Sequence, residues 1–266
     1  MPELPEVETV KETLKTRILG LKIVDIEIYY PKMMSDNTKS LLVNQTILDI
    51  SRLGKYLIFN LDDYDLISHL RMEGRYYIKT DEPVLKHEHV VFKLSNGQQL
   101  RYHDTRKFGT FDLRIKGETY HTKPLSLLGK EPFTMDPVEF YNVLRHKDRA
   151  IKTVLMDQKI IAGIGNIYAD EILYSAHVRP DRKAKDVSLQ EATWMIERAR
   201  GILQSAIEAG GTTIRTYVSS LGVTGRFQLT LMVHQRKGEL CYICGDEIKK
   251  KIVNGRSSFF CETCQS

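Results

Sequence analysis

The chain has 266 residues, of which 42% are hydrophobic and 27% charged, and it is long enough for two domains with sizeable cores. Its net charge of +5 permits an anionic partner such as nucleic acid but does not demonstrate one. The sequence contains neither an apolar stretch long enough to span a membrane nor the basic start of a signal peptide. We therefore expect a soluble intracellular protein with no membrane partner.

The first six residues allow two interpretations. Removal of Met1 would leave the secondary amine of Pro2 as the chain terminus, and an α-amine with a pKa of about 8 keeps a useful neutral fraction near neutral pH. Such an amine can attack an electrophilic carbon while the carboxyl groups of Glu3 and Glu6 move protons. The same segment also suits a helix start, with Pro5 near the first helical position. The segment alone does not decide between the two.

The first half of the chain combines one helix with many short strands. Apolar residues at helical spacing predict a helix over residues 5–18. From residue 22 to about residue 115 the pattern changes to short β-type runs, and Asn96-Gly97 marks a hairpin turn between two of them. The runs are Ile23–Tyr30, Tyr56–Leu61, Val90–Leu94, Leu100–His103 and Phe108–Ile115. Strands at this spacing indicate a sandwich or barrel-like domain.

The second half is mainly helical and follows a crossing linker at residues 117–135. Asp136 and Pro137 predict one helix start, and the capping box Ser188–Glu191 opens a helix that runs to about Glu208. Asn166 is predicted to be the N-cap of a further helix over residues 167–176. The positive end of that helix can bind an anion such as a DNA phosphate, although Asn166 fits a plain cap as well.

The cysteines predict a zinc ribbon in the last part of the chain. All four lie in two CxxC pairs separated by 16 residues, Cys241, Cys244, Cys261 and Cys264. A secreted disulfide framework would not leave the preceding 240 residues without cysteine. Four thiolates suit a tetrahedral zinc ion and leave no open coordination position. We therefore expect one structural Zn²⁺ and a β-hairpin that carries Arg256 near its tip.

Side chains at several predicted turns also have two interpretations. Met72, Arg106 and Phe108 suit insertion into a base stack, where they would fill the gap left by a flipped nucleotide. Judged by themselves, Met72 and Phe108 fit core positions better. Lys55 is compatible with a phosphate contact or with an exposed place on a strand.

Together these segments resemble a known family. The chain is similar to the bacterial formamidopyrimidine-DNA glycosylases, which repair 8-oxoguanine, over essentially its full length. The motifs that carry the resemblance occur in one order and are Pro2–Thr9, Gly54–Leu57, His69–Met72, Asp104–Gly109, Leu125–Gly129, Ala162–Glu171 and Gly255-Arg256. The resemblance favours the nucleophile interpretation for Pro2, insertion for Met72 and Phe108, and a phosphate contact for Asn166.

The resemblance implies an α+β multidomain fold. An N-terminal catalytic β-sandwich with flanking helices would occupy residues 1–131, a helix-two-turns-helix DNA-binding domain residues 132–220, and a capping loop with the four-cysteine zinc ribbon residues 221–266. The loop around residues 219–227 would close over the everted base. The implied partner is double-stranded DNA that contains oxidised bases or abasic sites. The implied form is a monomer in the bacterial cytoplasm that works at the nucleoid.

The resemblance also implies a reaction. The enzyme would be a DNA-formamidopyrimidine glycosylase, an N-glycosyl hydrolase, and a class I abasic-site lyase. It would excise oxidised purines through a Schiff base on Pro2, followed by β,δ-elimination. The implied catalytic residues are Pro2, Glu3, Glu6, Lys55 and Arg256. The implied DNA contacts are His69, Met72, Arg106, Phe108, Lys152, Asn166 and Arg256.

Two alternatives remain open. An endonuclease VIII-like glycosylase for oxidised pyrimidines shares the Pro-Glu start, the helical turn and the ribbon. That group typically has glycine where this chain has Leu4, and Arg106 and Phe108 favour the purine enzyme. The second alternative is a non-catalytic zinc-ribbon protein that recognises damaged DNA, against which the intact Pro2 and Glu3 argue.

Overall fold

The computed structural model describes residues 1–212 and 225–266 and divides into two compact units. The first unit is Met1–Ser126 with Gly210–Arg226, and the second is Leu127–Ala209 with Phe227–Ser266. The division into three domains stays a prediction, and residues 219–224 of the predicted capping loop lie outside the described residues. None of the helices among the described residues is long and apolar enough to cross a bilayer.

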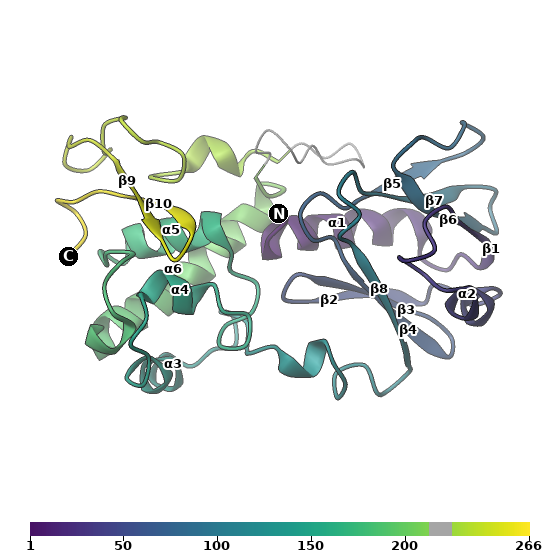
Figure 1. Cartoon of the computed structure of the whole chain (residues 1–266), viewed down its shortest axis with the longest axis horizontal. Helices are drawn as coiled ribbons and strands as arrows, with labels where there is room; N and C mark the ends of the chain where they lie inside the picture. Colours follow the sequence, from purple (N-terminus) through teal and green to yellow (C-terminus); the bar gives the residue numbers. More distant parts are fainter. Residues whose placement is uncertain (213–224) are drawn as a thin grey trace. The chain divides into compact units, whose positions relative to one another are not determined.

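The first unit is a β-sandwich of two antiparallel four-stranded sheets (Figure 1). One sheet has the strand order β1-β6-β7-β5 and the other the order β2-β3-β4-β8. The strands are β1 (Ile23–Ile28), β2 (Asp49–Leu53), β3 (Tyr56–Asn60), β4 (Tyr64–His69), β5 (Arg75–Lys79), β6 (Glu88–Leu94), β7 (Gln99–His103) and β8 (Thr110–Ile115). The sandwich expected from the strand spacing is confirmed.

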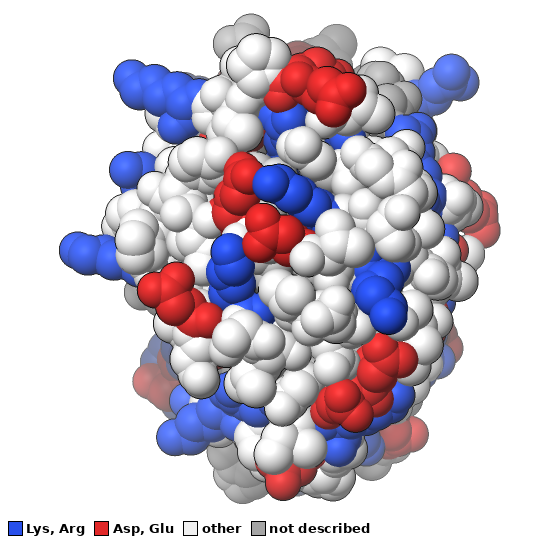
Figure 2. All heavy atoms as spheres, turned by 90° about the vertical axis from the view of Figure 1, so that its right-hand side faces the viewer, with Lys and Arg blue, Asp and Glu red and all other residues white. Residues whose placement is uncertain are grey.

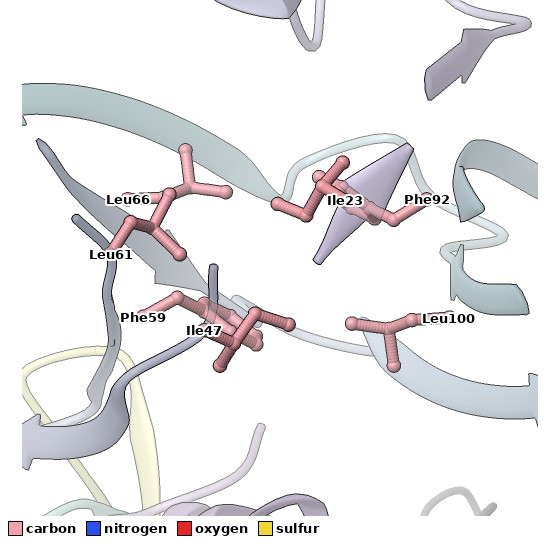
Figure 3. A pocket seen from close by; sticks show the side chains of 7 residues that line it. All are labelled: Ile23, Ile47, Phe59, Leu61, Leu66, Phe92 and Leu100. Carbon is pink, nitrogen blue, oxygen red and sulfur yellow. The ribbon is translucent and has the colours of Figure 1, made fainter. Parts of the chain in front are cut away.

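The core of the sandwich combines apolar side chains from both sheets with one face of helix α1 (Leu4–Ile18). Val7, Leu14 and Ile18 are fully buried, and α1 packs against β2 and β3, which confirms the helix predicted over residues 5–18. Burial of each such side chain contributes roughly 1.5–3 kcal/mol to stability. Figure 3 shows a small apolar cavity that remains in this core, lined by Ile23, Ile47, Phe59, Leu61, Leu66, Phe92 and Leu100.

Local turn and cap signals account for the remaining elements of the first unit. The hairpin at Asn96-Gly97 joins β6 and β7, and Gly97 has a φ of 85°, which glycine adopts at little cost. The predicted hairpin is therefore confirmed. Helix α2 (Asp36–Leu42) begins at Ser35, whose hydroxyl accepts a hydrogen bond from the Thr38 amide.

The second unit packs four α-helices around a core of its own. They are α3 (Pro137–Leu144), α4 (Ile151–Leu155), α5 (Asn166–Ser175) and α6 (Leu189–Glu208). Short 3₁₀ turns of this unit are η2 (Ala184–Asp186) and η3 (Phe227–Thr230), and η1 (Leu125–Leu127) lies where the chain passes from the first unit to the second. Asp136 accepts from the Glu139 amide at 2.9 Å, and Ser188 forms a reciprocal capping box with Glu191. Both predicted helix starts are confirmed.

The predicted cap of α5 is wrong by one residue. Gly165 is the N-cap, with an extended backbone, and Asn166 is the first helical residue. Gly163 has a φ of 98°, so the glycines supply the turn into the helix, and the Asn166 side chain is not needed as the cap.

The cysteine-bearing segment folds as a hairpin in the second unit. Strands β9 (Lys249–Val253) and β10 (Arg256–Phe260) pair antiparallel, with Arg256 opposite Val253. Asn254 and Gly255 form the turn, both with positive φ, so Arg256 lies at the tip as predicted. Helix α5 lies against β10.

Candidate functional site

The amino terminus brings two buried carboxylates directly beside Pro2. Glu3 is the N-cap of α1 and only 2% exposed, and Glu6 is 4% exposed. The Glu3 side chain accepts from the Glu6 amide, and Glu6 Oε2 accepts from the Glu3 amide at 2.9 Å. This capping box confirms the helix start, and the same hydrogen bonds fix both carboxylates next to Pro2.

Glu6 has a further partner that the sequence analysis missed. Its Oε1 atom accepts from the Thr212 amide at 2.8 Å and from the Thr212 hydroxyl at 2.9 Å. Gly211 approaches so closely that a methyl group on it would lie 3.0 Å from Glu6 Oε1. Since a buried carboxylate is stable only when it is hydrogen-bonded, these donors hold Glu6 in place. In the sequence, only Gly210-Gly211 before Thr212 indicates that two segments of the chain approach each other closely. No motif spacing connects these glycines with Glu6.

The surroundings of the terminus favour a neutral amine. Burial lowers the pKa of the Met1 amine below its ordinary value, against the opposing influence of the Glu3 and Glu6 carboxylates. Pro2 itself is buried as well. Desolvation at this place therefore outweighs the attraction of two neighbouring carboxylates for a proton.

Lys55 lies at the tight turn between β2 and β3 and is 4% exposed, so the exposed strand position considered for it is excluded. Arg52 ties this turn to α1. Its Nη1 atom donates to the Gly54 carbonyl at 2.9 Å, and its Nε atom pairs with Glu8 Oε2 at 2.7 Å. The turn that carries Lys55 is thereby fixed to the helix that carries Glu3.

His69 is buried at the end of β4 and is electrically neutral. Burial, assisted by the charges of Arg71 and Lys55, lowers the pKa of His69 to about 3. Its Nδ1 atom accepts from the Arg71 amide at 2.9 Å, which assigns the ring proton to Nε2. A phosphate contact by His69 would therefore use a neutral N–H donor.

The three residues predicted to enter the base stack lie in two loops of the first unit. Met72 is half-buried in the loop between β4 and β5, and Arg106 and Phe108 lie in the loop between β7 and β8. Phe108 is 52% exposed, which excludes a core position, and the Arg106 guanidinium lies 4.7 Å from the centre of its ring.

Charge alone does not mark one end of the first unit as a DNA-binding face. Figure 2 views the end of this unit where β1 and α2 lie, and lysine and arginine side chains there are interspersed with acidic ones. Lys39 pairs with Asp25 at 3.1 Å, and Lys93 pairs with Glu27 at 2.5 Å. Because such exposed pairs largely cancel, this end of the unit presents no continuous positive surface to DNA.

Asn166 presents an unusual polar atom at the start of α5. Among the described residues, its Oδ1 atom is buried without a hydrogen-bond partner. Buried amide oxygens normally accept a hydrogen bond, so this one needs a donor, whereas a phosphate would have to bind the N–H groups of Asn166. The predicted phosphate contact of Asn166 stays a prediction.

Lys152 is enclosed within the second unit. It is 1% exposed, and its ammonium pairs with Asp170 Oδ1 at 2.7 Å. The same ammonium donates to the Ser257 carbonyl at 2.8 Å and to the Ser258 hydroxyl at 2.9 Å. In this position Lys152 supports the strand that begins at Arg256, and its predicted DNA contact stays a prediction.

The four cysteines are arranged for a metal ion. Their sulfur atoms all lie within 4.8 Å of one another, with Cys241 and Cys264 3.8 Å apart and Cys244 and Cys261 3.4 Å apart. Sulfurs about 2.3 Å from a tetrahedral zinc ion are about 3.8 Å apart, so the cluster fits one structural zinc ion. The Tyr174 hydroxyl, 3.1 Å from Cys241 Sγ, adds a polar contact outside the ligand set.

Three family models match successive parts of the chain. They are the formamidopyrimidine-DNA glycosylase N-terminal domain at residues 1–111, the formamidopyrimidine-DNA glycosylase H2TH domain at residues 128–218, and the zinc finger found in FPG and IleRS at residues 234–266. The zinc-finger match and the cysteine cluster together confirm the predicted structural zinc.

Relatives and solved structures agree with these models over the whole chain. The formamidopyrimidine-DNA glycosylase of Oceanobacillus iheyensis is 46% identical over 100% of this chain and 98% of its own length. That of Halalkalibacterium halodurans is 45% identical over 100% of both chains. A Lactococcus lactis mutant enzyme in complex with a Fapy-dG-containing DNA is 43% identical, with a TM-score of 0.95 over 99% of both chains. A complex of the Lactococcus lactis enzyme with an abasic-site-containing DNA gives 43% identity and a TM-score of 0.94 over 99% of both chains. The chain therefore belongs to the formamidopyrimidine-DNA glycosylase family.

Proposed function

We propose that this chain is a DNA glycosylase and abasic-site lyase that removes oxidised purines, including 8-oxoguanine and formamidopyrimidines, with Pro2 as its nucleophile. The observation that carries the proposal is the position of Pro2 directly before two carboxylates that are 2% and 4% exposed, Glu3 and Glu6. Membership of the family, and likeness to enzymes solved with Fapy-dG or abasic DNA, support the substrate class.

The proposed reaction needs only groups that the chain supplies. After removal of Met1, the neutral Pro2 amine attacks C1′ of a nucleotide rotated out of the duplex, and the damaged base leaves. The product is a cationic iminium that joins protein and sugar. Its positive charge acidifies the neighbouring carbon, so β-elimination and then δ-elimination cut the strand. Glu3 moves protons during ring opening, and Glu6 supports it.

In this proposal both units contribute side chains that contact DNA. In the first unit Lys55 and His69 contact phosphates, and Met72, Arg106 and Phe108 fill the gap in the stack. In the second unit the contacts come from the start of α5 at Asn166 and from the hairpin tip at Arg256. Lys55 and Arg256 also assist the elimination steps. The zinc ion holds the hairpin rigid and takes no part in the chemistry.

Borohydride trapping on a duplex with 8-oxoguanine opposite cytosine tests the proposal. Protein that lacks Met1 should form a covalent complex, and protein that retains Met1 should form none, because its Pro2 nitrogen is a tertiary amide. Pro2→Gly should trap weakly through a primary amine. Glu3→Gln should bind the duplex but lose base excision. Trapping by Met1-retaining protein would contradict the assignment of the nucleophile.

A duplex with thymine glycol opposite adenine separates the remaining alternatives in the same assay. Faster excision of thymine glycol than of 8-oxoguanine would favour an endonuclease VIII-like glycosylase. Binding without any strand cleavage would favour a non-catalytic sensor of damage. Because the substrate in this proposal is chromosomal DNA, we expect the protein to act at the nucleoid in the bacterial cytoplasm.

A further inference from the structure

The two loops predicted to enter the base stack share one buried support. One loop, residues 70–74, ends at Gly74, and the other, residues 104–109, ends at Gly109. A methyl group on Gly109 would lie 2.6 Å from Tyr102 Cζ, and one on Gly74 would lie 2.9 Å from the same atom. The Tyr102 hydroxyl oxygen would lie still closer to each of these two methyl groups. The fully buried Tyr102 side chain therefore leaves no room for a side chain at either glycine, and the Leu70 carbonyl oxygen adds to the crowding at Gly74.

A hydrogen bond also joins the loops directly. The Thr105 hydroxyl of the second loop donates to Glu73 Oε2 of the first. The contact lies on the outer side of the loops, whereas Tyr102 lies beneath them. Two independent contacts therefore set the spacing between the loops.

The second loop is rigid because a buried carboxylate organises its backbone. Asp104 is fully buried, and its Oδ1 atom accepts from the Arg106 amide at 3.0 Å. Its Oδ2 atom accepts from the amides of Phe108 at 2.9 Å and Gly109 at 2.8 Å. Hydrogen bonds from backbone N–H groups to a carboxylate are among the stronger ones in proteins, so Asp104 stabilises the shape of this loop.

We propose that the two loops form one preassembled wedge, and that Tyr102 is the positioning residue that sets the spacing between Met72 and Phe108. The inference rests on the proposed function, in which these side chains replace a flipped nucleotide. Stacked bases are separated by about 3.4 Å, so side chains from both loops have to enter a narrow gap together. A displacement of about 1 Å between them would impair insertion, and such errors cost on the order of 10²-fold in other active sites.

The variant Tyr102→Phe tests the role of the hydroxyl, since it keeps the ring and removes the atom that would lie nearest to a methyl group on either glycine. The probe is a duplex with a tetrahydrofuran abasic analogue and 2-aminopurine as the neighbouring base, and stopped-flow fluorescence reports filling of the gap. We expect the filling rate of Tyr102→Phe to fall about tenfold or more. Trapping on single-stranded abasic DNA, which has no gap to fill, should keep the wild-type rate.

Tyr76→Phe is the matched control. Tyr76 is also fully buried, its ring lies 5.2 Å from that of Tyr102, and its hydroxyl donates to Ser68 at 2.7 Å. It should lose a comparable amount of stability but keep the wild-type filling rate. Equal slowing in both variants, or equal loss of trapping on single-stranded DNA, would mean that the Tyr102 hydroxyl serves stability alone and would overturn the proposal.

A double-mutant cycle makes the test specific to the spacing. In the wild-type background, Met72→Ala and Phe108→Ala should act non-additively on the filling rate, because both side chains belong to one wedge. In the Tyr102→Phe background the two effects should become additive. Unchanged coupling would contradict the role of Tyr102 while leaving the proposed function intact. If borohydride trapping on Pro2 fails as well, the proposed function itself is wrong.

Discussion

At the scale of single residues, burial decides which ionisable groups carry charge. His69 is 7% exposed, with a pKa lowered to about 3, and it stays neutral throughout the physiological range. The amine of Met1 responds to the same cause, because desolvation lowers its pKa although two carboxylates lie nearby. A neutral donor and a neutral amine are the forms that the proposed chemistry needs.

The neutral state of His69 predicts a loss of stability in mild acid. The unfolded chain binds a proton on this histidine below pH 6.5, whereas the folded chain does so only near pH 3, so the free energy of unfolding falls as the pH drops through that window. At about pH 5 the loss from His69 alone should be about 2 kcal/mol. Urea unfolding at about pH 7.5 and about pH 5 measures it.

His69→Gln should show a smaller difference between the two pH values than the wild type. His121→Gln, at an exposed position, is the control and should keep the wild-type difference. A His69→Gln protein with an unchanged pH dependence would argue against the lowered pKa.

At the scale of elements, a buried ion pair joins helices and hairpin within the second unit. Lys152 on α4 and Asp170 on α5 are each 1% exposed, and Asp170 also contacts His234 Nδ1 at 2.7 Å. Glu171, the next residue on α5, accepts from three successive backbone amides, those of residues 232–234. These contacts connect helices α4 and α5 to strand β10, which begins at Arg256. A substitution in the helices should therefore change the stability of the strand.

Lys152→Met should therefore destabilise the second unit strongly. Removal of one partner from a buried pair leaves an uncompensated charge and costs about 3–5 kcal/mol. Lys183→Met, which removes an exposed pair with Asp148, should cost less than about 1 kcal/mol. Urea unfolding gives both values, and hydrogen exchange over residues 249–260 should rise only in Lys152→Met. Similar costs for the two variants would contradict the enclosed position of Lys152.

Removal of zinc should unfold the ribbon while leaving the sandwich intact. The module depends on its metal for folding, because so small a hairpin has little core of its own. A strong chelator should abolish binding to an abasic duplex, and far-ultraviolet circular dichroism should retain the β-sheet signal of the first unit. Cys244→Ser should behave like the chelated protein. Full DNA affinity after complete zinc loss would show that the hairpin is dispensable.

The elements that were predictable from sequence are those with local signals. Caps at Asp136 and Ser188, the Asn96-Gly97 turn and the cysteine spacing each depend on residues a few positions apart, and each is found as expected. The cap of α5 was misplaced because Gly165 takes the position given to Asn166. This error is only one residue because the backbone conformation at a helix start depends mainly on residues close in sequence.

The parts of the site that were not predictable depend on contacts between distant segments. Neither the enclosure of Lys152 nor the closeness of Tyr102 to two loop glycines follows from any spacing in the sequence. The contact between Glu6 and Thr212 joins positions separated by 206 residues. Such contacts arise from packing of the folded chain, and residue type alone says little about them.

At the scale of the whole molecule, the contact between Glu6 and Thr212 has a consequence for synthesis. Pro2, the proposed nucleophile, is among the first residues to be made, but Thr212, which donates to the Glu6 carboxylate, is added when four-fifths of the chain is complete. Contacts of such high sequence separation form late in folding. A chain that ends before residue 212 would present the amine and both acids yet lack the two hydrogen bonds that hold Glu6 Oε1. Incomplete chains should therefore be harmless to DNA, and competence to cut a strand should come only with the finished fold.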